Sequence, residues 1–296
     1  MSTRTVLAFQ HDAKLYTLPT TVVSITPFKS LDEANQQLFK TSTTEADYVV
    51  VTRETIFHPQ GGGQPSDTGT MKSLDEKTTF SVSAVRMDCV HDGEVLHLGR
   101  FDNETTSDKV ATTSFPSPSS PSSSSTPPLF NVGETITQSI DIDKRILYSR
   151  LHTAGHVLGA AVRHLLEPHI ADFDELKASH FPDSAACEFK GLIEGKWKAD
   201  IQTRVDEYVA RALPVQVDFW TEEDFRDRGL ERLIPSPEAG RLRLAPGEKY
   251  RVVKIVGAEV YPCGGTHVDS TDLCGKVGVK KISRNKGTSR VSYTVA

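Results

Sequence analysis

The sequence predicts an α+β protein in which a small β-barrel-like domain, residues 1–140, precedes an α+β domain, residues 141–296. Short β-branched runs such as "DYVVVT" and "TFSVSAV" alternate with Gly, Pro and Asp in the first half, as a small all-β module requires. Beyond Asp141, apolar residues recur at steps of three and four, which is typical of an amphipathic helix. We therefore expect the change from strands to mixed structure near residue 140.

A Ser/Pro segment interrupts the first half. Thirteen of the fifteen residues in "SFPSPSSPSSSSTPP", residues 114–128, are Ser or Pro, a composition that cannot build a packed core. Strand-like residues resume directly afterwards in "GETITQSID". The segment, about residues 101–129, is therefore predicted to be a disordered insertion within the first domain.

The second half begins with a predicted helix from Asp143, placed to cap it, to Glu167, where Pro168 stops it. Another helix is expected near residues 200–212. The runs "PVQVDFW", "YRVVKIV" and "GVKKIS" have the β-branched content of strands. We expect the first helix to pack on an antiparallel sheet built from such strands.

Bulk properties limit the class of protein. The 296 residues suit two domains, and contents of 37% hydrophobic and 25% charged residues are near globular averages. A formal net charge of −5 means that any contact with nucleic acid needs a local basic patch. No apolar run approaches the roughly 20 residues of a membrane span. The four cysteines are unevenly spaced and the start has no signal-like pattern, so a cytoplasmic protein without membrane contact is expected.

Two motifs offer metal ligands. In "LHTAGH", His152 and His156 stand at i and i+4, so both imidazoles project from one helix face. In "YPCGGTH", Cys263 and His267 are separated by two glycines and a threonine, which permits a tight loop around an ion. One thiolate and three imidazoles suit zinc better than magnesium or calcium, so one Zn²⁺ per chain is predicted.

Several alternatives stay open for these motifs. The histidine pair alone is more often a polar helix flank than a metal site. Thr153 stands where the "HExxH" metalloproteases carry a glutamate, which argues against peptidase chemistry. Four protein ligands would close a tetrahedral zinc and make the site structural, whereas catalysis needs an exchangeable position. The general base is not identified by the sequence.

Three separated motifs resemble the AlaX family of freestanding editing proteins, which is related to the editing domains of alanyl- and threonyl-tRNA synthetases. They are "FHPQGGGQPSDTG", residues 57–69, with "LHTAGH" and "CGGTH". The glycine-rich motif is similar to the signature of the alanine branch, so the combination favours tRNA(Ala). The resemblance implies a trans-editing hydrolase that deacylates Ser-tRNA(Ala) or Gly-tRNA(Ala) without ATP, through a zinc-bearing helix, at the acceptor end.

Two further groups of residues are expected to contact the substrate or the tRNA. The glycine loop can bring backbone N–H groups close to a phosphate or ribose, although a tight turn in a barrel would explain it as well. A basic strip without acidic residues, which contains Lys280, Lys281, Arg284 and Lys286, could contact the acceptor stem or could be a solvated edge strand. We expect substrate contacts from Gly61, Gly62, Gly63, Gln64 and Thr153, and tRNA contacts from Lys280, Lys281, Arg284 and Lys286.

Two rival functions remain at this stage. The first is a zinc-stabilised tRNA-binding module without catalytic activity, which catalytic turnover on charged tRNA would exclude. The second is a zinc hydrolase of small esters or peptides, which should ignore tRNA as a competitor. The sequence does not distinguish serine from glycine as the substrate, and it leaves the oligomeric state open, with a monomer as one option.

Overall fold

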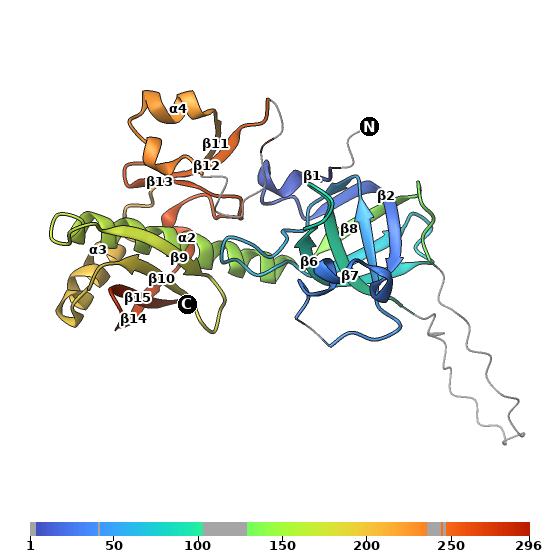
Figure 1. Cartoon of the computed structure of the whole chain (residues 1–296), viewed down its shortest axis with the longest axis horizontal. Coiled ribbons are helices and arrows are strands. Elements are labelled where there is room, and N and C mark those ends of the chain that lie inside the picture. The colour runs from blue at the N-terminus through green and yellow to red at the C-terminus, as the bar shows by residue number, and fades with distance from the viewer. Residues whose placement is uncertain (1–3, 41, 103–128, 236–243, 245–246) are drawn as a thin grey trace, which may run out of the picture.

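A computed structural model describes residues 4–40, 42–102, 129–235, 244 and 247–296. A closed barrel of strands lies at one end of the molecule, and a sheet covered by helices lies at the other (Figure 1). The long helix α2 starts beside the barrel and runs along the sheet (Figure 1). The fold is therefore mixed α and β, as the sequence predicts.

The barrel consists of six antiparallel strands in the order β2-β3-β7-β6-β5-β8. Its interior is filled by alternate apolar residues, among them Met71, Phe80 and Ile136, each with no exposed surface. The predicted β-barrel is therefore confirmed. The strands of this half are β1 (Val6–Leu7), β2 (Thr17–Pro27), β3 (Tyr48–Thr52), β4 (Glu54–Thr55), β5 (Gly69–Ser73), β6 (Thr79–Met87), β7 (Val95–Phe101) and β8 (Thr135–Ile140), with the short helix α1 (Glu33–Gln36).

The second half contains an antiparallel sheet in the order β14-β15-β10-β9 and a smaller sheet in the order β11-β12-β13. Helix α2 and helix α3 contribute to one apolar core with the larger sheet. The elements are α2 (Ile142–Leu166), β9 (Asp174–Ser179), β10 (Ala186–Lys190), α3 (Lys198–Ala210), β11 (Val215–Trp220), α4 (Glu222–Asp227), β12 (Tyr250–Ile255), β13 (Glu259–Pro262), β14 (Val277–Asn285) and β15 (Thr288–Val295).

The N-cap of helix α2 lies two residues earlier than expected. Asp141, not Asp143, is the N-cap, because the Asp141 carboxylate accepts a hydrogen bond from Lys144 N at 3.1 Å. Asp143 lies in the first turn, where a carboxylate also favours the helix dipole. The helix ends at Leu166 with Glu167 as C-cap, directly before Pro168, as predicted.

A buried ion pair joins the barrel to α2. Arg145 and Asp67, 1% and 0% exposed, form a salt bridge, and Arg145 also donates to Ala13 O and Ile56 O. Asp67 accepts from His58 N at 2.6 Å and so closes the loop that contains the glycine-rich motif. This pair fixes that loop against the start of α2.

Two sequence predictions lie beyond what the fold tests. The Ser/Pro insertion falls almost entirely outside the described residues. The division into two domains at residue 140 stays a prediction, although β8 ends at Ile140 and α2 begins at Ile142. Within the described part of the chain, no helix combines the length and apolarity needed to span a membrane.

Candidate metal centre

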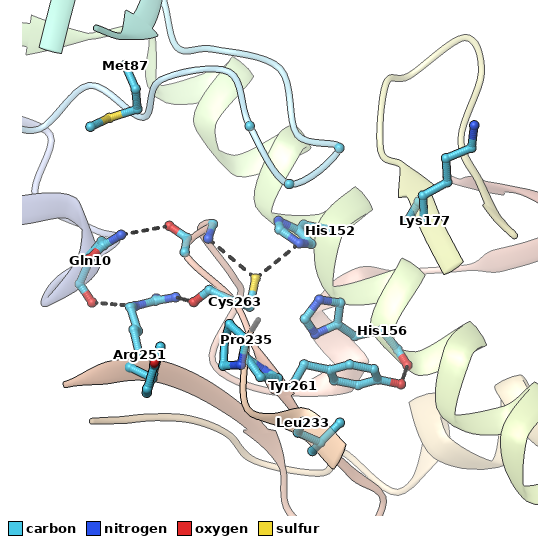
Figure 2. A pocket seen from close by; sticks show the side chains of 18 of the residues that line it. Gln10, Met87, His152, His156, Lys177, Leu233, Pro235, Arg251, Tyr261 and Cys263 are labelled. Atoms are coloured by element: carbon cyan, nitrogen blue, oxygen red, sulfur yellow. Dashed lines mark hydrogen bonds between the residues drawn. The ribbon is translucent and has the colours of Figure 1, made fainter. Parts of the chain in front are cut away.

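The four predicted ligands come together in the structure. One ligand atom from each of His152, His156, Cys263 and His267 lies within 4.8 Å of the others. Cys263 Sγ is 3.4 Å from His152 Nε2 and 3.3 Å from His267 Nε2. Helix α2 supplies one pair and the loop after β13 supplies the other, and Figure 2 shows His152, His156 and Cys263 facing a common point.

The chemistry of the cluster fits a metal ion. Burial lowers the pKa values of His152, His156 and His267 well below the usual range, with further lowering by neighbouring histidines, so the imidazoles are neutral and can be ligands. His156 Nδ1 is buried without a hydrogen-bond partner among the described residues. Buried polar atoms rarely lack a partner, and a metal ion would satisfy this one. The cluster could hold one ion, and its donor set favours zinc.

Gln64 and Thr153 form hydrogen bonds with two histidines of the cluster. Gln64 Oε1 accepts from Thr266 N at 3.0 Å and lies 2.7 Å from His152 Nδ1, so we assign the proton of His152 to Nδ1. Thr153 Oγ1 is 3.1 Å from His267 Nδ1 and accepts from Val268 N at 3.2 Å. Both histidines therefore present Nε2 to the cluster, an arrangement in which outer hydrogen bonds orient metal ligands.

These positions differ from the role expected for Gln64 and Thr153. Both side chains have no exposed surface, and their polar atoms are committed to the cluster and its loop. A substrate would have to displace those hydrogen bonds to reach them. They are supports of the candidate metal centre in this structure and do not face the cleft.

The loop that carries Cys263 is held by buried polar contacts. Arg251 on β12 donates to Cys263 O at 2.6 Å and to Gln10 O at 2.8 Å, as drawn in Figure 2. Tyr261 donates to His156 O at 3.1 Å, and its ring lies 4.2 Å from the His156 ring. The backbone around Cys263 is therefore held to both α2 and the N-terminal segment.

The cluster opens into a cleft of about 2720 Å³ lined by both halves of the chain. His152, His156 and Cys263 form part of its wall, and the barrel contributes the glycine loop. Glu175 on β9 also lines it, where burial raises the pKa of its carboxyl to about 7 despite the neighbouring Arg163 guanidinium. Such a cleft can admit the end of a large substrate.

The glycine loop is both a tight turn and part of the cleft wall. Gly61 and Gln64 pair their backbones at 2.9 and 3.3 Å, and Gly62 and Gly63 have φ of 55° and 81°. A Cβ at Gly63 would overlap Ala178 O, so the loop can lie against β9 only with glycine there. Gly61 and Gly62 are exposed and line the cleft. The turn and substrate interpretations are therefore compatible.

The basic strip lies elsewhere. Lys280, Lys281 and Arg284 are exposed on β14 and Lys286 follows it, at the edge of the sheet opposite β9. None of these four lines the cleft. The strip is close to the metal loop in sequence but two strands intervene between β14 and β9 in the sheet.

His180 was not singled out from the sequence. It lies directly after β9, stacks on His152 with ring centroids 4.3 Å apart, and lines the cleft. Burial lowers its pKa to about 4. Its lone position in "KASHFP" carries no spacing signal that could have identified it.

A second group of possible ligands, Asp88, His91 and Glu94, is weaker. Asp88 Oδ1 already accepts hydrogen bonds from Asn35 Nδ2, Val90 N and His91 N at 2.6 to 2.9 Å. Those bonds explain the carboxylate as the acceptor of a turn. We assign no metal to it.

Comparisons with known proteins agree with this geometry. Residues 250–292 match the model of the threonyl and alanyl tRNA synthetase second additional domain. The chain is 26% identical over 255 residues to the alanyl-tRNA editing protein AlaX-M of Methanosarcina barkeri, covering 85% of this chain and 90% of that protein. It is 27% identical over 249 residues to AlaX-L of Pyrococcus horikoshii, covering 83% and 50%. Over most of its length, the chain is similar to alanyl-tRNA editing proteins of the AlaX family.

The similarity extends to a class of larger enzymes. An alanine–tRNA ligase from Methanosphaera stadtmanae is 28% identical over 251 residues, which are 83% of this chain and 24% of the ligase. The chain thus spans about a quarter of that ligase and half of the AlaX-L relative. The matched segment 250–292 includes Cys263 and His267.

Proposed function

We propose that this chain is a trans-editing hydrolase that deacylates tRNA(Ala) wrongly charged with serine or glycine, in the cytoplasm. The observation that carries the proposal is the convergence of His152, His156, Cys263 and His267 beside a large cleft, whose wall includes the first three. The names of the AlaX-M and AlaX-L relatives support alanyl-tRNA editing as the activity.

In the proposed reaction, the four residues would hold one Zn²⁺, whose positive charge would help to orient the aminoacyl end and to polarise its carbonyl. Gln64 and Thr153 keep the imidazoles of His152 and His267 in fixed orientations. The exposed Gly61 and Gly62 allow the terminal ribose or a phosphate to approach the backbone. Because an aminoacyl ester is already activated, positioning of water and substrate supplies much of the rate.

The second candidate is a zinc-stabilised tRNA-binding module. The full set of four protein ligands favours it, since a closed tetrahedral site is typical of structural zinc. For either function we propose that Lys280, Lys281, Arg284 and Lys286 contact the acceptor stem. Their position away from the cleft allows a contact with the helical stem while the terminal nucleotides enter the cleft.

The test is release of the amino acid from Ser-, Gly- and Ala-tRNA(Ala), with and without a chelator. Selective, metal-dependent loss of serine or glycine is expected, and no loss of any amino acid would favour the binding module. The double variant Cys263→Ala/His267→Ala should lose both zinc and activity. His169→Ala, which removes an exposed histidine that does not line the cleft, is the control. Full activity in a zinc-free Cys263/His267 variant would rule out the mechanism.

A further inference from the structure

The cleft contains a hydrogen-bond acceptor that the metal centre does not use. His180 stands beside His152 on the outer side of the cluster, 2% exposed, and its backbone N–H donates to Gly63 O at 2.8 Å. A Cβ at Gly155 would overlap the His180 ring, so the imidazole occupies the space that a side chain on α2 would otherwise fill. The position of His180 is therefore set by the glycine loop, α2 and a metal ligand together.

The protonation of the ring follows from its neighbours. Tyr293 Oη donates its single hydrogen to Leu151 O at 2.9 Å and lies 2.7 Å from His180 Nδ1. The proton of that second contact must then come from the imidazole, so we assign it to Nδ1. In the neutral ring this leaves the lone pair on Nε2.

His180 Nε2 is directed to the cleft. It has no hydrogen-bond partner among the described residues. In that part of the chain, the fully buried side-chain atoms without a partner are His156 Nδ1 and Arg163 Nε, so His180 Nε2 keeps some exposed surface. Because His180 lines the cleft, Nε2 is accessible from it. Other polar groups near the cluster are committed: Gln64 to His152, Thr153 to His267, Tyr261 to His156 O, and Cys187 Sγ to Gly155 O.

Such an acceptor can discriminate serine from alanine, because the seryl hydroxyl can donate a hydrogen bond to it. The two aminoacyl groups differ by one hydroxyl, and a site gains selectivity for a hydroxyl when it offers a buried polar partner that the shorter analogue leaves unpaired. We propose that His180 Nε2 accepts a hydrogen bond from the seryl hydroxyl, which makes serine rather than glycine the preferred misacylated substrate. This inference rests on the proposed function, because it places the aminoacyl group in the same cleft.

Two substitutions separate the ring nitrogens. In His180→Asn the amide can stand near the position of Nδ1 and keep the Tyr293 contact, but nothing replaces Nε2. In His180→Gln the amide reaches the position of Nε2. If His180 recognises serine, binding depends on a polar atom at the position of Nε2. If its role is purely structural, the atom at the position of Nδ1 is the one that matters.

The experiment measures the affinity of zinc-loaded full-length chain for 3′-seryl-, 3′-alanyl- and 3′-glycyl-amide analogues of adenosine, which cannot be hydrolysed, by titration calorimetry. The wild type should bind the seryl analogue about tenfold or more tightly than the other two. His180→Asn should lose this preference with unchanged zinc content, and His180→Gln should retain part of it. Equal binding of all three analogues by the wild type, or an unchanged preference in His180→Asn, would overturn the inference.

A parallel assay of Ser-tRNA(Ala) hydrolysis distinguishes this inference from the proposed function. Preference for the seryl analogue without hydrolysis would retain the role of His180 and overturn the editing activity. The opposite result is hydrolysis of both Ser- and Gly-tRNA(Ala), with the same ratio of the two rates in the wild type and in His180→Asn. It would retain the editing activity and overturn the role of His180.

Discussion

Gln64 Oε1 lies 2.7 Å from His152 Nδ1, so a glutamine in the glycine-rich loop of the barrel orients a histidine of the candidate metal centre on α2. The same oxygen accepts from Thr266 N, and the Gln64 amide donates to Thr266 Oγ1 at 2.9 Å. One side chain from the barrel thus contacts both segments that supply the ligands. This explains why a glutamine can follow the glycines without facing the cleft.

Replacing this glutamine should weaken metal binding. In Gln64→Ala, His152 loses the acceptor that fixes its tautomer, and zinc affinity should fall about 10- to 100-fold, the usual effect of removing an outer partner of a ligand. Affinity is measured by competition with a coloured chelator. Gln60→Ala, in the same loop but with no side-chain hydrogen bond to a ligand among the described residues, is the control. Equal zinc affinity in Gln64→Ala and Gln60→Ala would show that Gln64 does not support the site.

The ion pair between Asp67 and Arg145 should contribute strongly to stability. Asp67→Asn leaves the Arg145 guanidinium buried without its counter-charge, which typically costs about 3–5 kcal/mol in the free energy of unfolding. Denaturant unfolding of the zinc-loaded chain measures this loss. Asp183→Asn, at an exposed position, should change stability by less than about 0.5 kcal/mol. A similar small change in Asp67→Asn would mean that the pair is not buried in solution.

Much of this architecture could be predicted because its signals are local. The i, i+4 spacing of His152 and His156 and the short loop from Cys263 to His267 each place two ligands by themselves. The helices and strands of the second half could be predicted from the periodicity and composition of short stretches of sequence. The cap is Asp141 and not Asp143 because apolar periodicity does not fix the first residue of a helix, and both aspartates stand at its start.

The remaining features depend on contacts between distant segments. Gln64 and Thr266 are 202 residues apart, so neither motif alone shows that the glutamine is buried. His180 reaches the site only because β9 lies against the glycine loop and because Gly155 leaves space for its ring. The basic strip shows that nearness in sequence can also mislead. It follows the metal loop closely in sequence, but the strand order places β14 at the edge of the sheet opposite β9.

If the basic strip contacts tRNA, its removal should change the salt dependence of binding. Changing Lys280, Lys281, Arg284 and Lys286 to alanine removes exposed charges and should lower the slope of log K against log salt by about 0.9 for each lost duplex phosphate contact. Filter binding of uncharged tRNA(Ala) at several salt concentrations measures the slope. Lys72→Ala/Lys77→Ala, exposed on the barrel, is the control. An unchanged slope in the quadruple variant would leave the strip as a solvated edge strand.

His97 should make the stability of the chain sensitive to mild acid. It has no exposed surface, lies 2.8 Å from Thr55 Oγ1 through Nε2 and 2.8 Å from Val50 O through Nδ1, and burial lowers its pKa from 6.5 to about 4. Between these values the unfolded chain binds a proton that the folded chain does not. Stability therefore falls as pH decreases from 6.5 to 4, by about 3 kcal/mol for this group.

The variant His97→Gln should remove that dependence. The free energy of unfolding, measured by denaturant at intervals from pH 7 to pH 4, should fall less steeply than in the wild type, by up to about 1.4 kcal/mol for each pH unit within the window. Metal release and the other histidines act in both proteins and cancel in the difference, and His169→Gln, at an exposed position, should follow the wild type. Parallel pH profiles for wild type and His97→Gln would mean that His97 is protonated in the folded barrel, contrary to its two hydrogen bonds and its complete burial.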